Sequence, residues 1–163
     1  MRRFILALVL LFAFVSQALA AGTVTVTRHY SSQDGKVVVI KAACVGDVAN
    51  GSIPNTLITA ALVGQIQIPD TAQKWINDYT KAGYYLYEVK VVTGAVKPDA
   101  ADVYLLESLS GNTIFSQANL IPTTGTAYGT VSAYRAILSG VSVVVLNQST
   151  ASATYDIYIT LVR

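Results

Sequence analysis

Residues 153–162 read ATYDIYITLV, and their pattern indicates the class of fold. Apolar or aromatic side chains, among them Ile157 and Leu161, alternate with mostly polar ones, among them Asp156 and Thr160. Because successive side chains of a β-strand point to opposite faces, this alternation gives one buried face and one wet face. The C-terminal stretch therefore predicts a strand of an antiparallel sheet.

The same period of two recurs upstream. Residues 23–28 alternate threonine with valine and predict an edge strand or a half-exposed strand. Residues 84–92 (YYLYEVKVV) predict another strand with two distinct faces. Strict alternation places Tyr85, Tyr87, Val89 and Val91 on one face and Tyr84, Leu86, Glu88 and Lys90 on the other.

Further strands are predicted from short apolar runs bounded by turn residues. They cover residues 37–40, 102–107, 113–116 and 141–146, and the last of these is expected to form a hairpin with residues 153–162.

Turn and cap residues complete the predicted fold. Asp34-Gly35 marks a turn, because this pair favours positive φ, whereas residues 121–129 are rich in Thr, Gly and Pro and predict a loop. Pro69 and a capping residue after it predict one short helix near 70–82. Roughly eight strands with frequent turns predict an all-β fold, an antiparallel β-sandwich or jelly roll.

The N-terminus has the three parts of a secretory signal peptide. Two arginines supply positive charge, residues 4–15 are apolar, and residues 18–20 form the A-x-A cleavage site. This apolar run is shorter than the about 20 residues that span a bilayer. The sequence therefore predicts a signal peptide (1–20) and a single exported domain (21–163), secreted, periplasmic or at the cell surface, with no stable membrane span.

Removal of the leader changes the charge. The full chain has 11 Lys and Arg residues against 9 Asp and Glu residues, a net charge of +2. Loss of Arg2 and Arg3 leaves nine basic against nine acidic residues. The remaining basic residues are scattered singly, which argues against nucleic-acid binding. Copies of a chain with no net charge repel one another weakly, so we expect a homo-oligomer or assembly with another surface or particle protein.

The sequence offers no constellation that is typical of catalysis or of a cofactor or metal site. His29 is the only histidine, and Cys44, the only cysteine, is expected to be a buried side chain or an intermolecular link. Glu88 and Glu107 invite a glycosidase interpretation, but an exposed pair of Glu88 with Lys90 is simpler. We therefore expect a protein that is not an enzyme and that uses no cofactor.

Two carboxylates bracket a short loop. Asp99 and Asp102 could hold calcium together with backbone carbonyls. The chain lacks the D-x-[DN]-x-[DN]-G pattern of calcium loops, so a capped turn is the favoured interpretation of these residues.

The ten tyrosines all lie beyond the leader, and three of them crowd residues 84–87. Adjacent residues of a strand face opposite ways, so Tyr84 and Tyr85 cannot both be core residues. Tyrosine is enriched in interface hot spots, so an aromatic contact face for a carbohydrate or a protein partner is the alternative to ordinary core packing. The residues favoured for this face are Trp75, Tyr84 and Tyr158.

From residue 83 onward, the chain resembles small, mostly uncharacterised β-sandwich proteins encoded among the structural genes of tailed phages. The resemblance rests on residues 83–87, 93–98, 102–106, 118–120 and 140–145. It is one of composition, without a catalytic motif. It implies a virion or particle component and carries no active site to this chain.

Together these features predict a non-enzymatic exported β-domain that assembles with itself or decorates a particle or a cell surface. The alternative is a carbohydrate-binding module with an aromatic platform.

The leader yields a direct prediction. N-terminal sequencing of the protein recovered outside the cytoplasm should begin at Ala21, because the cleavage site ends at Ala20. A recovered chain that still begins at Met1 would contradict cleavage, and it would keep the net charge of +2.

Overall fold

The structure is a computed structural model that describes residues 22–58, 84–107, 111–131, 137 and 140–163. The predicted signal peptide (1–20) and the predicted helix near 70–82 lie outside these residues. Within them the chain forms nine β-strands and no helix, which confirms the all-β class. No helix of the described residues is long and apolar enough to cross a membrane.

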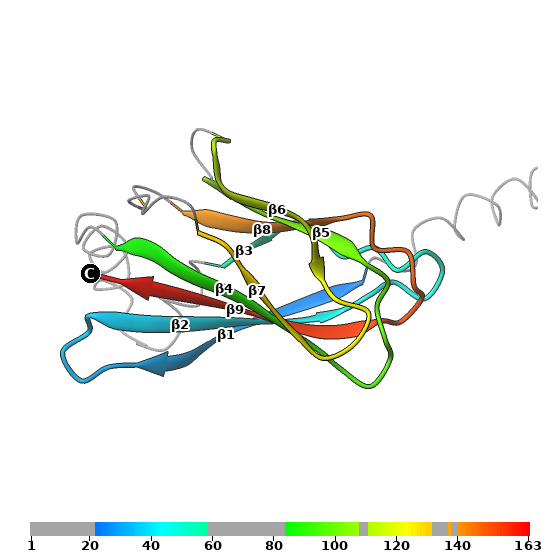
Figure 1. Ribbon diagram of the computed structural model, residues 1–163, viewed down its shortest axis with the longest axis horizontal. Coiled ribbons are helices and arrows are strands. Elements are labelled where there is room, and N and C mark those ends of the chain that lie inside the picture. The colour runs from blue at the N-terminus through cyan, green and yellow to red at the C-terminus, as the bar shows by residue number, and fades with distance from the viewer. Residues whose placement is uncertain (1–21, 59–83, 108–110, 132–136, 138–139) are drawn as a thin grey trace, which may run out of the picture.

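The strands form two antiparallel sheets that lie as two layers (Figure 1), an arrangement consistent with a β-sandwich. The five-stranded sheet has the order β1 (Thr23–Ser31), β2 (Val37–Val45), β9 (Thr154–Val162), β4 (Tyr85–Thr93), β7 (Thr126–Gly129). The four-stranded sheet has the order β3 (Thr56–Leu57), β8 (Val141–Leu146), β5 (Ala101–Glu107), β6 (Thr113–Ile121).

One apolar core lies between the layers and takes side chains from both sheets. The central strand β9 follows the predicted alternation, and its inward side chains are at most 2% exposed: Tyr155, Ile157, Ile159 and Leu161. The four-stranded sheet contributes Val103, Leu105 and Val143, each at most 1% exposed. Full burial of one aliphatic side chain stabilises a fold by about 1.5–3 kcal/mol, so this core is the main source of stability.

The predicted hairpin of residues 141–146 and 153–162 is wrong. These segments become β8 and β9, which lie in different sheets: β8 pairs with β3 and β5, whereas β9 pairs with β2 and β4. Neighbouring strands in sequence often pair, but here β9 pairs along its whole length with β2, and β8 pairs along its whole length with β5. The intervening loop therefore crosses from one layer to the other.

Residues 121–129 are not simply the loop that their composition predicts. Thr126–Gly129 forms β7, which pairs with β4 from Val89 to Val92. The strand predicted at 113–116 likewise continues to Ile121 as β6. In both places the partner strand supplies hydrogen bonds that local composition does not reveal.

A β-bulge corrects the predicted faces of β4. Its register with β9 shifts between Leu86 and Glu88, so Tyr87 is the additional residue. Such an insertion reverses the alternation beyond it. Val89 and Val91 therefore share the buried face with Leu86, while Tyr85, Tyr87, Glu88 and Lys90 lie on the outer face.

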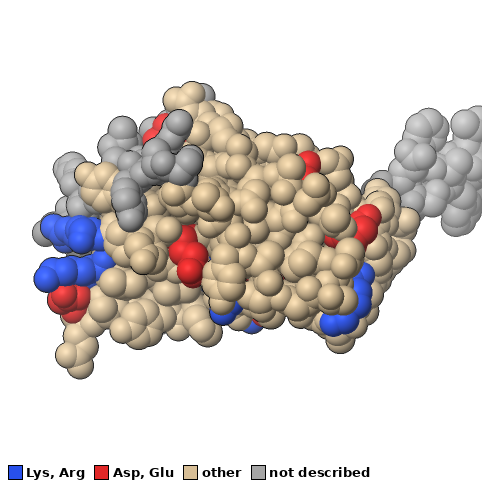
Figure 2. All heavy atoms as spheres, in the orientation of Figure 1, with Lys and Arg blue, Asp and Glu red and all other residues tan. Residues whose placement is uncertain are grey.

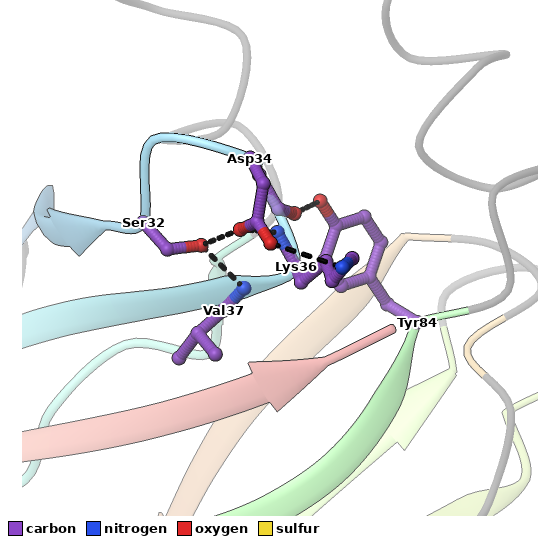
Figure 3. Close-up of polar contacts among 6 residues, drawn as sticks. Ser32, Asp34, Lys36, Val37 and Tyr84 are labelled. Atoms are coloured by element: carbon purple, nitrogen blue, oxygen red, sulfur yellow. Dashed lines mark hydrogen bonds and ion pairs between the residues drawn. The ribbon is translucent and has the colours of Figure 1, made fainter.

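The turn between β1 and β2 is closed by its own polar contacts (Figure 3). The Ser32 hydroxyl donates to Asp34 Oδ1 at 2.7 Å and accepts from the Val37 amide at 2.9 Å. The Lys36 amide donates to Asp34 Oδ1 at 3.1 Å, and Lys36 Nζ lies 3.2 Å from Asp34 Oδ2. The hydrogen bonds from Ser32 and Lys36 lower the pKa of Asp34 to about 2. Gly35 has a φ of 67°, which confirms the predicted turn.

Tyr84 joins this turn to the start of β4. Its hydroxyl donates to the Gly35 carbonyl (Figure 3), and its side chain is part of the core. Tyr155 differs, because its buried hydroxyl has no hydrogen-bond partner within the described ranges. Burial also raises the pKa of Tyr155 well above its ordinary value. The Tyr84 hydroxyl thus stabilises a turn through a hydrogen bond, whereas the Tyr155 hydroxyl is buried without a hydrogen bond among the described residues.

These two tyrosines form a matched pair for a stability test. Tyr84→Phe removes a hydrogen bond and should lower the free energy of unfolding by about 1 kcal/mol. Tyr155→Phe removes a buried hydroxyl without a partner and should leave the free energy of unfolding unchanged or raise it. Urea unfolding of both variants beside the unsubstituted chain measures the difference. A loss at Tyr155→Phe as large as that at Tyr84→Phe would contradict this assignment.

Candidate functional site

Four side chains form one row across the outer face of the five-stranded sheet. The strand register places Lys41 of β2 opposite Tyr158 of β9, Tyr158 opposite Lys90 of β4, and Lys90 opposite Tyr128 of β7. We call these residues the lysine–tyrosine row. Adjacent strands lie about 4.8 Å apart, so the row spans about 14 Å of the sheet.

The lysines lie over the tyrosine rings. Lys90 Nζ is 5.6 Å from the ring centroid of Tyr158 and 5.7 Å from that of Tyr128. Lys41 Nζ is 5.7 Å from the Tyr158 centroid. His29 contacts the same ring edge to face, at 5.1 Å and 73°. These cation–π and ring contacts fix Tyr158 between neighbours on three sides.

The two lysines of the row differ in their charge partners. Lys41 Nζ lies 2.7 Å from Asp156 Oδ2, and this hydrogen bond raises the pKa of Lys41. The Tyr158 hydroxyl also donates to Asp156, at 3.5 Å. Lys90 forms no ion pair among the described residues, so the expected pair with Glu88 is absent there. The ammonium group of Lys90 instead forms cation–π contacts with Tyr128 and Tyr158.

Two bulges add further side chains to this outer face. The register of β1 with β2 shifts between Arg28 and Tyr30, with His29 as the additional residue. The bulge of β4 acts in the same way at Tyr87. Tyr30 is 54% exposed and Tyr87 is 53% exposed, so both rings reach solvent. Both bulges therefore enrich one sheet face in aromatic side chains.

Charged side chains are sparse on the side of the molecule that Figure 2 shows. Lysine and arginine occur there in small separate groups, near the two ends and on the lower edge near the middle. No continuous basic stripe crosses this side. The distribution agrees with the scattered basic residues of the sequence and gives no support to a phosphate-binding surface here.

The residues that the sequence analysis favoured for a contact face have different surroundings. Tyr158 lies at the centre of the lysine–tyrosine row, whereas Tyr84 is 4% exposed and belongs to the core. Trp75 lies outside the described residues. Lys90 and Tyr128 were not among the favoured residues, and the alternation of residues 84–92 was the one available signal for Lys90.

Asp99 and Asp102 both accept hydrogen bonds from residues that are distant in the sequence. The Ser149 amide donates to the Asp99 carboxylate at 3.1 Å, and the Ser149 hydroxyl donates to it as well. Burial alone would raise the pKa of Asp99, but the hydrogen bonds from Ser149 outweigh it and lower the pKa. Asp102 accepts from the Asn119 amide at 2.8 Å and from Asn147 Nδ2 at 2.6 Å. Both carboxylates therefore connect segments that are distant in the sequence, and the capped turn between them stays a prediction.

The two candidate glutamates lie in different sheets. Glu88 is on the outer face of the five-stranded sheet, pointing away from the layer that contains Glu107 at the end of β5. A glycosidase needs its two carboxyl groups within about 10 Å on either side of one bond. This placement gives the glycosidase interpretation no support.

Cys44 is a free cysteine, 2% exposed, whose Sγ lies 3.6 Å from the Ala42 carbonyl oxygen. Burial, with a smaller contribution from Asp156, raises the pKa of the thiol to about 12. The expected buried position is therefore confirmed. A thiol in this state has almost no thiolate, which is the form that reacts.

We predict that Cys44 of the folded protein does not react with a thiol reagent such as Ellman's reagent at about pH 8. One thiol per chain should react after unfolding in guanidinium, where the pKa returns to its ordinary range. Stoichiometric labelling of the folded chain, or an intermolecular disulfide in native material, would contradict the buried assignment.

No family model, curated protein or solved structure matches this chain, so its fold and its surface carry the functional argument.

Proposed function

We propose that the chain is a non-enzymatic exported structural domain that assembles with copies of itself, as a subunit of a particle or of a cell-surface layer. The observation that carries the proposal is the edge strand β1. In the part of the chain that the structure describes, β1 pairs with β2 and with no other strand. An unpaired strand edge presents amide and carbonyl groups that can pair with another chain.

Of the four sheet edges in the described residues, β1 is the best suited to pairing. β3 has two residues and β7 has four. β6 has nine residues, but its register with β5 shifts twice and Asn119 has a φ of 54°. β1 also has nine residues, and its register is unbroken from Thr23 to Arg28.

The composition of β1 also favours pairing. Residues 23–27 contain only threonine and valine, with none of the charges, prolines or bulges that protect strand edges. Val24 and Val26 pack against the core but remain partly exposed. A second β1 would cover the exposed part of these valines. The zero formal charge of residues 21–163 keeps repulsion between copies small.

Antiparallel pairing of two β1 strands gives a two-fold dimer, in which each copy presents the same surface to the other. Two five-stranded sheets then become one continuous sheet. The dimer is the smallest unit of the proposed assembly, and the resemblance to phage structural proteins accords with such a subunit.

The test uses light scattering during size-exclusion chromatography of residues 21–163. Along β1, successive N–H groups point alternately toward β2 and toward the free edge of the sheet. Of the two substitutions Thr25→Pro and Val26→Pro, one therefore removes an N–H that faces β2 and the other removes an N–H that faces the free edge. The substitution at the position that faces β2 removes a hydrogen bond of the sheet and lowers the melting temperature. The other removes only an outward N–H, leaves the melting temperature nearly unchanged, and should weaken dimerisation at least tenfold, a loss of about 1.4 kcal/mol.

The matched control is proline at the outward-facing position of β7, either Ala127 or Tyr128, which should leave the oligomeric state unchanged. A strict monomer at high concentration for the unsubstituted chain would overturn the proposal. So would a dimer that survives both substitutions in β1.

A further inference from the structure

Lys90 differs from the other lysines that the structure describes. Lys36 and Lys41 lie 3.2 Å and 2.7 Å from carboxylate oxygens, and Lys97 Nζ donates to the Gly94 carbonyl at 3.2 Å. The ammonium group of Lys90 has no oxygen acceptor within the described ranges and lies over two tyrosine rings. A cation in this position has its hydrogen-bond donors available for an anion.

The exposed ring of Tyr128 suits a sugar. Tyr128 is 59% exposed on the edge strand β7, and Tyr158 lies on the other side of Lys90. The two tyrosines are two strands apart, about 10 Å, which is of the order of the length of a disaccharide. The exposed Tyr128 ring offers a flat apolar face for sugar C–H groups and a hydroxyl that can form hydrogen bonds with sugar hydroxyls.

The nearby acidic groups restrict the charge of the ligand. Asp156 neutralises Lys41, and Glu88 lies on the same face as Lys90, two residues away along β4. A polyanion with more than one negative charge per sugar would be repelled by these carboxylates. A ligand with one carboxylate per sugar would place one of these carboxylates on Lys90.

From these contacts we infer that the lysine–tyrosine row binds an acidic polysaccharide of the uronic-acid type. One sugar ring stacks on Tyr128, and the carboxylate of the neighbouring sugar accepts hydrogen bonds from Lys90. Binding does not depend on assembly through β1, because Lys90 and both tyrosines belong to the three strands farthest from that edge.

The test is isothermal titration of residues 21–163 with galacturonate oligosaccharides and with a neutral glucan oligosaccharide of the same length. Galacturonate should bind at least ten times more tightly than the glucan, and added salt should weaken its binding. Lys90→Gln and Tyr128→Ala should each weaken galacturonate binding at least tenfold. Thermal unfolding of each variant establishes that the fold is retained.

Two controls keep the result specific. Lys97→Gln removes a lysine outside the row, and Tyr104→Ala removes a tyrosine from β5 of the other sheet; both should bind as the unsubstituted chain does. The proline variant of β1 that loses assembly should still bind the oligosaccharide, which separates this inference from the proposed self-assembly. Equal binding of the two sugars, no binding of galacturonate, or unchanged binding by Lys90→Gln would each overturn the inference.

Discussion

The pairing of β9 with both β2 and β4 is the constraint on which the rest of the structure depends. The ladder with β2 runs without a break from Val37 opposite Val162 to Val45 opposite Thr154. It brings the C-terminal strand to the middle of the five-stranded sheet, between segments that precede it far upstream. The chain must close these long loops before the sheet gains its central hydrogen bonds, so we expect the sheet to form late in folding. The same register sets the surface, because a slip of one residue would exchange Tyr158 with Ile157.

The sequence alone predicts the structure correctly where the pattern of residues within one segment determines it. The alternation of residues 154–162, the threonine–valine edge strand and the Asp-Gly turn all depend on local chemistry, and the structure confirms them. The sequence alone does not predict the structure where pairing with another strand determines the conformation of a segment. The bulge at Tyr87 reverses the faces of β4, yet nothing in the residues themselves distinguishes an inserted tyrosine from a paired one. β7 likewise becomes a strand only because β4 provides its partner.

In the candidate site, too, some residues could be predicted from local alternation and others depend on partner strands. Tyr158 could be found from alternation alone, because it lies on the polar face of a clear strand. Tyr84 was misplaced on the surface, since the bulge three residues later reverses the alternation and the turn that its hydroxyl binds covers it. The row itself joins residues from four strands, and Tyr128 lies in a segment whose composition predicts a loop. Cross-strand neighbours of this kind become visible only once the strand order is known.

The edge strand and the lysine–tyrosine row are properties of one sheet, and this gives the two proposals a joint consequence. In an antiparallel pair the two-fold axis is perpendicular to the sheet, so pairing of two β1 strands keeps both outer faces on the same side. The order of strands then places seven strand spacings, about 34 Å, between the two Lys90 residues. A polymer long enough to reach both rows would bind the second one as an intramolecular event, and its avidity would exceed the affinity of a single row. Assembly through the edge would thus convert a weak contact with one sugar segment into firm attachment to an extended polysaccharide.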